Sequence, residues 1–301
     1  GLDRLTGPCS GRGAAGKWRD AATDEHGDLI DLIRLNLGLG TLGEALDEAR
    51  SFLSLPSHRT EARRHVNPHR GSKARTSSEI ARALFAKARP IVGTPAEAYL
   101  RTRGITCALG DLWSLRFDPD CYYRESDEHE PERWPALLAA ITDASGTITA
   151  VQRTWLDRVR PAKAPVSDPK RTIGPQRGGG VRLGLVQDVL AVGEGIETML
   201  SLRSALPRLP MLAGLAASHL SALELPAGVV RLYIAHDNDP EGWRAEARLQ
   251  ARLVGRSVDI RSLRPAFGDF NVDLLRLGLE QFRKRVVRQL AAEDRERFAG
   301  A

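Results

Sequence analysis

Two apolar runs that end in acidic residues and glycine constrain the fold of this chain most. Each run reads as a buried parallel strand, and each is followed by a helical pattern. The strand ends read Glu194-Gly195 and Asp237-Asn-Asp239-Pro-Glu-Gly242. In an open parallel sheet, ligands collect beyond the carboxyl ends of the strands. We therefore expect Glu194, Asp237 and Asp239 to meet at one edge of a sheet.

Three carboxylates held close together repel one another unless a hard cation lies among them. Sites built only from oxygen ligands suit Mg²⁺, which keeps several waters and accepts phosphate oxygens as further ligands. The spacing therefore predicts a Mg²⁺ site for phosphodiester chemistry, with Mn²⁺ as a possible substitute. The alternative is two ordinary strand-to-helix turns whose acidic residues favour the helix starts.

The two motifs together resemble the Toprim domain of bacterial-type primases, topoisomerases and some nucleases. The resemblance implies that Glu194, Asp237 and Asp239 are catalytic and bind the metal. It also implies that Gly195 and Gly242 are structural turns. Farther along, Gly268-Asp-Phe-Asn-Val-Asp273 resembles the third acidic motif of the family, and this resemblance implies that Asp269 is a further metal ligand.

A basic stretch precedes these motifs. Residues 151–185 carry eight basic side chains against two acidic ones, an excess equal to the +6 of the whole chain. Basic side chains beside an acidic metal site suggest a surface that holds a polyanion near the metal, although a solvated loop would have the same composition. The candidates for binding nucleotide or DNA are Arg153, Lys170, Arg171 and Arg182.

The middle of the chain resembles the subdomain in front of Toprim in primases of plasmid and phage type. That subdomain has a hairpin ending in arginine and then a Pro-Lys dipeptide. Here the turn is Asp143-Ala-Ser-Gly146, the arginine is Arg153, and the dipeptide is Pro169-Lys170. Upstream, the sequence predicts a helix capped by Ser78, and another with Thr94 as cap, Pro95 at its first position and Gly104 at its end.

The first 56 residues resemble the rear half of the zinc ribbon of bacterial-type primases. Gly27-Asp28, read as a turn, and Glu44-Ala45 match it, but the second cysteine pair is replaced by the segment that begins at Trp18. A structural zinc site needs four ligands, and Cys9 with His26 cannot supply them. We expect a zinc-free remnant, or a domain cut at its amino end, whose apolar residues pack on the rest of the chain.

These observations predict an α/β fold with five parts. A small zinc-free module spans residues 1–56 and a polar, basic linker spans 57–78. An α+β primase-like subdomain spans 79–184. A Rossmann-like Toprim βα domain with a parallel central sheet spans 185–280, and a basic C-terminal helix spans 281–301. That last helix could contact nucleic acid or simply be solvated.

The primase-like features favour a Mg²⁺-dependent nucleotidyltransferase that makes primers on single-stranded DNA from nucleoside triphosphates, in plasmid or phage replication. A Toprim nuclease and a non-catalytic DNA-binding accessory are the alternatives. The sequence contains no helicase P-loop, so a helicase partner would be a separate chain. The chain is too short for the strand-passage domain of a topoisomerase.

The remaining composition indicates a cytoplasmic protein that does not enter a membrane. No window approaches 18 uninterrupted apolar residues, and no signal-peptide pattern is present. The three cysteines, Cys9, Cys107 and Cys121, are far apart and odd in number. They support neither a disulfide framework nor a zinc knuckle, so a reducing compartment is the simplest setting.

Overall fold

The computed structural model describes residues 5–6, 17–20, 26–30, 33, 76–126, 128–176 and 178–299. The chain divides into two compact units, Gly1–Ser72 and Lys73–Ala301. The expected linker up to residue 75, Cys9 and the expected helix around Glu44-Ala45 lie outside the described residues.

The first unit contains a three-stranded antiparallel sheet in the order β1-β2-β3. Its strands are β1 (Leu5–Thr6), β2 (Lys17–Asp20) and β3 (His26–Asp28). Trp18 therefore lies in a strand. Gly27 and Asp28, which the sequence suggested as a turn, lie within β3 and pair with Trp18 and Lys17. The absence of zinc from this module remains a prediction.

One ten-stranded sheet runs through the second unit, in the order β13-β12-β10-β11-β9-β6-β5-β4, with β7 paired to β6 and β8 paired to β7. Its strands are β4 (Arg89–Pro90), β5 (Leu115–Tyr123), β6 (Glu132–Thr142), β7 (Ile148–Trp155), β8 (Lys170–Ile173), β9 (Gly180–Leu183), β10 (Val189–Gly193), β11 (Met211–Ala213), β12 (Arg231–Ala235) and β13 (Asp259–Leu263).

The helices described in this unit are α3 (Ser77–Lys87), α4 (Pro95–Thr102), α5 (Ile196–Ala205), α6 (Ala217–Ser221), α7 (Pro240–Leu253), α8 (Phe270–Gln289) and α9 (Ala292–Ala299). Strands and helices alternate from β10 onward, as the sequence predicted. The unit is thus a mixed α/β fold, and its sheet is largely parallel in this part.

The four strands β11, β10, β12 and β13 are parallel and their last residues are in register. Gly193 lies opposite Ala213 and Ala235, and Ala235 lies opposite Leu263. Every residue of β10 is buried, because helices cover both faces of the sheet. The carboxyl ends of these strands form one straight edge, from which the loops that carry the acidic residues emerge.

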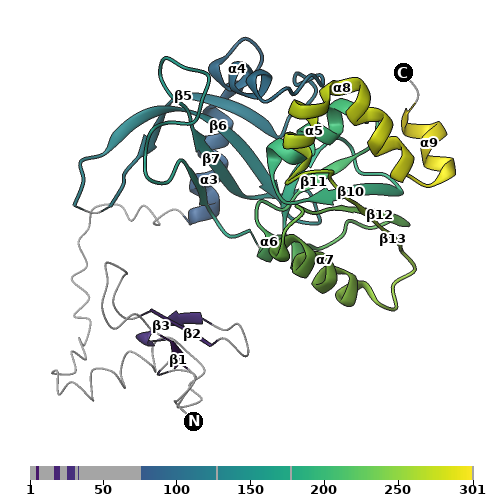
Figure 1. Ribbon diagram of the computed structural model, residues 1–301. Helices are drawn as coiled ribbons and strands as arrows, with labels where there is room; N and C mark the ends of the chain where they lie inside the picture. Colours follow the sequence, from purple (N-terminus) through teal and green to yellow (C-terminus); the bar gives the residue numbers. More distant parts are fainter. Residues whose placement is uncertain are drawn as a thin grey trace. The chain divides into compact units, whose positions relative to one another are not determined.

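Two apolar cores lie on the two faces of this parallel half. Figure 1 shows α5 and α8 on one side of its strands and α6 and α7 on the other. Alternate strand residues such as Ala191 and Tyr233 face α5 and α8, where Met199 and Phe270 pack against them. The intervening strand residues face α6 and α7, in a second cluster that includes Leu249. This sandwich holds the strand ends, and so the acidic loops, in fixed positions.

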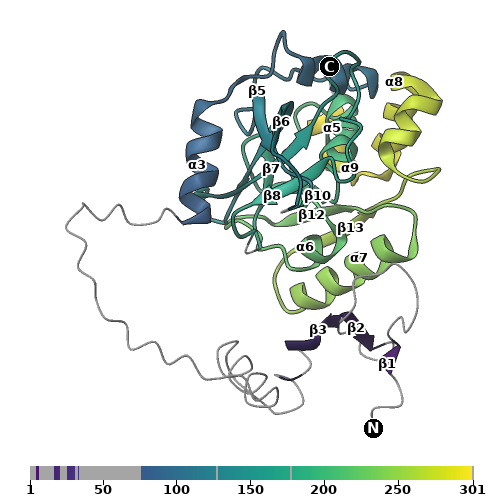
Figure 2. The ribbon, with the colours of Figure 1, turned by 90° about the vertical axis from the view of Figure 1, so that its left-hand side faces the viewer.

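The antiparallel half is built on the β6–β7 hairpin, whose turn is Asp143–Gly146 as expected. Gly146 has a φ of +91°, which only glycine adopts without strain. Helix α3 packs against β7 and β8 (Figure 2). Its N-cap is Thr76 rather than Ser78, because Thr76 and Glu79 form a capping box.

Helix α4 begins and ends as the sequence predicts. Thr94 occupies the N-cap, Pro95 is the first helical residue, and Gly104 follows the helix with a φ of +73°. Thr94 makes no side-chain capping bond. Its hydroxyl instead donates to the carbonyl of Ile91, and Glu97 accepts the Gly93 N–H at 2.7 Å.

Strand β9 joins the two halves into one sheet. It pairs with β11 through Val181, Arg182 and Leu183, and with the end of β6 through Gly180 and Val181. The expected boundary between residues 184 and 185 therefore crosses a continuous sheet and a shared apolar core.

The chain from residue 270 onward forms a kinked helix and a short terminal one. Helix α8 runs from Phe270 to Gln289 and is interrupted at Gly278, which has a φ of +72°. The segment expected as one basic helix over residues 281–301 comprises the second half of α8 and the separate helix α9. In the described part of the chain, no helix is long and apolar enough to cross a membrane.

Candidate active site

Acidic residues follow three neighbouring parallel strands at the edge described above. Glu194 directly follows β10, Asp237 comes two residues after β12, and Asp269 ends the loop that follows β13. The backbone ties these loops together, because the Asn238 N–H donates to the Gly268 carbonyl at 2.8 Å. The structure thus places all the predicted metal ligands on one row of strand ends.

Two of these acids cap the helices that follow them. Asp239 is the N-cap of α7 and accepts the Gly242 N–H at 2.8 Å. Asp269 is the N-cap of α8 and accepts the Val272 N–H at 2.7 Å. Each cap uses one carboxylate oxygen, Oδ1, and holds the negative charge at the positive end of a helix.

Glu194 and Asp237 have buried oxygens that no partner satisfies. The atoms are Glu194 Oε1 and Asp237 Oδ1. A buried carboxylate oxygen without a hydrogen bond is costly, and a bound cation would remove that cost. Both side chains are only partly exposed, so water has limited access to them.

Burial and mutual repulsion shift the acidity of this pair. Burial raises the pKa of Glu194 to about 7, and the charges of Asp237, Asp239 and Glu241 act in the same direction. Burial likewise raises the pKa of Asp237 to about 6, with Asp269 and Asp239 adding to the effect. These charges therefore lie close enough to oppose one another, which a divalent cation would relieve.

The residues present fit Mg²⁺. Among the described residues, no three Asp, Glu, His or Cys side chains lie close enough to enclose a metal ion. Mg²⁺ does not require such a cage, because it is usually held by one or two carboxylates together with waters and substrate phosphates. Glu194 and Asp237, with their unpartnered oxygens, would be those carboxylates, and Asp239 and Asp269 lie in the adjoining turns.

The glycine of the second motif allows the loop to fold back on itself. A Cβ at Gly242 would lie 2.4 Å from the Asp237 carbonyl oxygen and 3.0 Å from its nitrogen. No side chain fits there, so the first turn of α7 can rest on the backbone of Asp237 only with glycine. Gly195 serves differently, as the N-cap of α5.

Behind the acidic loops lies a buried polar pair that the sequence did not assign. His236 is buried at the end of β12, with Nε2 3.1 Å from Glu246 of α7. Its Nδ1 lies 2.9 Å from the carbonyl oxygen of Asp237. Glu246 also accepts hydrogen bonds from Ser262 and Gln250. This network fixes the backbone from which Asp237 projects.

Lys170 lies beside the first turn of α5, the helix that follows Glu194 in the chain. Its ammonium group is 2.9 Å from Glu197, a buried residue on the first turn of α5, which also accepts the Tyr99 hydroxyl at 2.8 Å. Burial alone would raise the pKa of Glu197, but Lys170 and the hydrogen bonds from Lys170 and Tyr99 lower it to about 2.

A second lysine joins this cluster. Burial lowers the pKa of Lys163, and the nearby charge of Lys170 lowers it further. The charges of Lys163 and Lys170 therefore lie near one carboxylate, that of Glu197, which only Lys170 contacts directly. The sequence analysis missed Lys163, Glu197 and Tyr99. One feature of the sequence could have identified Glu197, namely that it lies one helical turn after Glu194.

The other predicted basic residues lie elsewhere. Arg153 and Arg171 are cross-strand partners on the opposite face of the β7–β8 pair from Lys170. Arg153 stacks over Trp155 at 4.8 Å, and Arg171 stacks over Tyr123 at 4.9 Å. Arg171 also binds Asp168 at 3.0 Å. Arg153, Lys170, Arg171 and Arg182 therefore do not form one binding surface.

Arg182 is used within the fold. Its guanidinium donates to the carbonyl oxygens of Asp143 and Ala144 at 2.8 and 2.9 Å. It thereby fastens the β6–β7 turn to β9. The sequence shows eight basic residues in this stretch but not which carbonyl groups they meet.

Comparison with known families decides the identity of the βα region. Residues 189–280 match the Toprim domain family. These residues form a Toprim domain. They contain Glu194, Asp237, Asp239 and Asp269. Residues 75–183 match a family described as a domain of unknown function, DUF7146. The comparison with curated proteins gives no match.

Solved primase structures resemble the chain. The Aquifex aeolicus primase with its zinc-binding and RNA polymerase domains is 14% identical, with a TM-score of 0.49 over 95% of this chain and 78% of that one. A DNA primase domain from Pseudomonas aeruginosa is 18% identical, with a TM-score of 0.45 over 71% and 78%. The primase fragment of the bacteriophage T7 primase–helicase protein is 18% identical, with a TM-score of 0.39 over 51% and 63%.

Proposed function

We propose that this protein is a Mg²⁺-dependent nucleotidyltransferase of primase type that extends primers on single-stranded DNA. The observation that carries the proposal is the pair of buried, unpartnered oxygens on Glu194 and Asp237, at the carboxyl edge of a Toprim domain. Burial raises the pKa of both carboxyl groups, and the neighbouring acidic charges add to this effect, which supports a cation at this position. Plasmid or phage replication, with a helicase on a separate chain, is the setting we propose.

In this reaction a 3′ hydroxyl attacks the α-phosphorus of a nucleoside triphosphate, and the bond to pyrophosphate breaks. When bound, Mg²⁺ supplies charge neutralisation at the attacking and leaving oxygens. Asp237 and Glu194 would hold the metal, with Asp239 and Asp269 beside them. Glu194 would either hold the metal or accept the proton of the hydroxyl.

The triphosphate would lie between the acidic edge and the lysine cluster. Lys170 and Lys163 carry one more positive charge than Glu197 neutralises, and the N-terminus of α5 adds backbone N–H groups. We therefore assign the nucleotide phosphates to Lys170 and Lys163. Arg153 and Arg171 lie on the other face of their strands, so a ligand at the acidic edge would not reach all of the predicted cations.

Primer synthesis tests this proposal directly. The protein is incubated with single-stranded DNA, labelled nucleoside triphosphates and Mg²⁺, and the products are resolved by length. Asp237→Asn and Asp239→Asn should each reduce product by about 100-fold or more, since each removes charge that supports the metal. Glu296→Gln, an exposed acid on α9, is the matched control.

The products also separate the alternatives. Shortened template in place of extended primer would identify a Toprim nuclease that uses the same residues. DNA binding without either product would identify a non-catalytic accessory. Equal product from wild type and from Asp237→Asn would refute the assigned site.

A further inference from the structure

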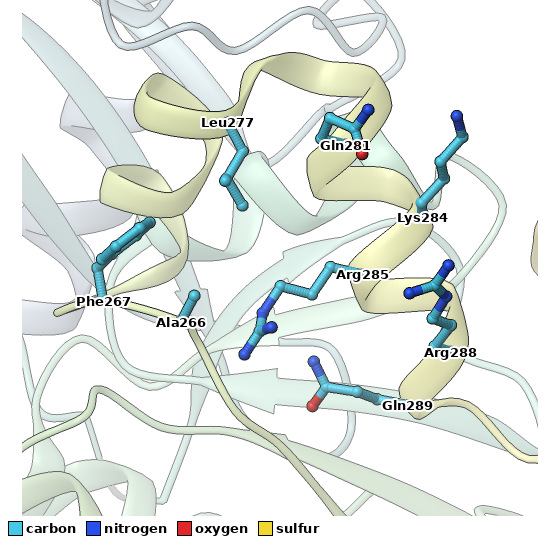
Figure 3. A pocket seen from close by; sticks show the side chains of 8 residues that line it. All are labelled: Ala266, Phe267, Leu277, Gln281, Lys284, Arg285, Arg288 and Gln289. Atoms are coloured by element: carbon cyan, nitrogen blue, oxygen red, sulfur yellow. The ribbon is translucent and has the colours of Figure 1, made fainter.

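A groove lies on the second half of α8, where that helix faces the loop between β13 and α8 (Figure 3). Its volume is 540 Å³. The wall on the loop side is formed by Ala266 and Phe267. The residues lining the groove from α8 are Leu277, Gln281, Lys284, Arg285, Arg288 and Gln289.

The groove is positively charged. None of its eight lining residues is acidic, and three are basic. Lys284 pairs with Glu280 at 2.6 Å, but this pair is exposed and contributes little neutralisation. Arg285 and Arg288 are exposed, and among the described residues their guanidinium groups have no hydrogen-bond or ion-pair partner. Their charges are therefore available to an anion.

One wall of the groove offers an aromatic ring. Phe267 is 38% exposed, and Arg276 of α8 stacks over its ring at 4.7 Å. In Figure 3, the Arg285 side chain extends from α8 towards the loop that carries Ala266 and Phe267. A basic groove with an exposed aromatic ring suits single-stranded nucleic acid, because the cations follow the phosphates and the ring accepts a base.

This wall is physically coupled to the acidic site. Asp273 accepts the N–H groups of Ala266 and Phe267 at 2.6 and 2.9 Å, which holds the loop against α8. Next in the chain, the Gly268 carbonyl accepts the N–H of Asn238, the residue between Asp237 and Asp239. Asp269 then follows directly. The loop from Ala266 to Asp269 therefore connects the groove to the acidic edge, and these hydrogen bonds hold it in place.

We infer that this groove binds the sugar–phosphate backbone of the single-stranded DNA on which the Toprim site acts. The inference rests on the proposed function and extends it to a second contact outside the metal site. Arg285 and Arg288 bind phosphates, and Phe267 stacks on a base. The occupant is the strand rather than the free nucleotide, because the proposed function assigns the triphosphate to Lys170 and Lys163, and a groove with several cations suits a run of phosphates.

Binding without metal tests the groove separately from catalysis. The full chain is titrated into fluorescently labelled single-stranded DNA in EDTA, and anisotropy gives Kd over a range of salt concentrations. Arg285→Glu/Arg288→Glu should weaken binding by about tenfold or more and reduce the slope of log K against log salt by about 1.4, since each lost phosphate contributes about 0.7.

A matched control removes the same charge elsewhere. Lys87→Glu/Arg256→Glu alters two exposed basic residues outside the groove, the last residue of α3 and a residue in the turn that follows α7. It should change Kd and slope by much less than the groove variant. Equal losses in the two double variants would mean that only net charge matters, and this would overturn the assignment. The single variants Arg285→Gln and Arg288→Gln repeat the test if the double variant unfolds.

Two further arms identify the ligand. Phe267→Ala should weaken binding by about tenfold without altering the salt slope, since it removes stacking and no charge. A labelled nucleoside triphosphate should bind the groove variant as well as it binds wild type. Loss of triphosphate binding with unchanged DNA binding would assign the groove to the nucleotide and refute the inference.

The outcomes also distinguish this inference from the proposed function. If wild type makes primers but the groove variant binds DNA normally, the groove assignment fails and the function stands. If wild type binds DNA through the groove but makes no product with Mg²⁺, the function fails and the groove assignment stands.

Discussion

At the scale of single residues, charge repulsion between Glu194 and Asp237 defines the metal-free site. Asp237→Asn removes one of the charges that raise the pKa of Glu194. The variant should be more stable than wild type without metal at pH 8, by about 1 kcal/mol. It should also lose the rise in Tm that Mg²⁺ gives to wild type, because the metal then has a weaker site.

Thermal unfolding with and without Mg²⁺ measures both effects. Glu296→Gln is again the control, since it removes an exposed acid far along the chain from the site. An undiminished Mg²⁺-induced shift in Asp237→Asn would show that the metal binds elsewhere.

The same pair predicts a pH dependence. The folded-state pKa values, about 7 for Glu194 and about 6 for Asp237, lie above ordinary values. The folded protein therefore binds more protons than the unfolded chain between about pH 4 and pH 7. These two groups should make the metal-free protein less stable as the pH rises through this window.

Bound Mg²⁺ should reverse this trend, because it favours the charged carboxylates. The Mg²⁺-induced increase in Tm should be small at pH 5.5 and should reach its full value near pH 8. An increase that is independent of pH over this range would contradict the assignment of these two carboxylates as ligands.

The ion pair of Lys170 and Glu197 should have the opposite effect on how stability depends on pH. The folded-state pKa of Glu197 is about 2, below its ordinary value, so the pair stabilises the fold above about pH 4 and loses this effect as the pH falls to 2. Lys170→Gln leaves Glu197 buried without its cation and should cost about 1–3 kcal/mol at pH 7.

Chemical unfolding of wild type and Lys170→Gln over pH 2–7 tests this prediction. The difference in unfolding free energy should shrink towards zero as the pH approaches 2. A constant difference at every pH would mean that Lys170 stabilises the fold by packing rather than by charge.

At the scale of elements, the strand-to-helix turn at Gly242 is the most constrained part of the site. A methyl group there would press on the backbone of Asp237, only 2.4 Å from its carbonyl oxygen. Gly242→Ala should therefore destabilise the protein by about 1–3 kcal/mol and weaken Mg²⁺ binding, because Asp237 must move.

Gly110→Ala is the matched control, because a Cβ there meets only Val92 at an ordinary 3.6 Å. Calorimetric Mg²⁺ titration and urea unfolding of both variants provide the comparison. If Gly242→Ala binds Mg²⁺ as tightly as Gly110→Ala does, the close approach does not position the ligand.

The elements around this turn were predictable from the sequence because their signals are local. A buried apolar run, an acid and a glycine specify a strand end and a helix start within a dozen residues, so the edge with Glu194 and Asp237 could be anticipated. The contacts that the basic residues make could not be predicted in this way. Whether Lys170 meets Glu197, or Arg182 meets a turn, depends on strand pairing between distant segments.

At the scale of the whole molecule, one sheet connects the two family matches. Strand β9 belongs to the first match by sequence, yet it pairs with β11 of the Toprim domain as well as with β6. A Cβ at Gly180 would collide with Leu212 and with the Ala213 carbonyl, so the two strands are in close contact. The unit from Lys73 to Ala301 should therefore unfold as one body.

Calorimetry of residues 73–301, with residues 1–72 removed, tests this cooperativity. We expect a single transition whose calorimetric and van't Hoff enthalpies agree. Mg²⁺ should move the entire transition to higher temperature, because a ligand at the acidic edge stabilises everything that unfolds with that edge. Two transitions, of which Mg²⁺ moves only one, would show that residues 75–183 and the Toprim domain fold independently despite their shared sheet.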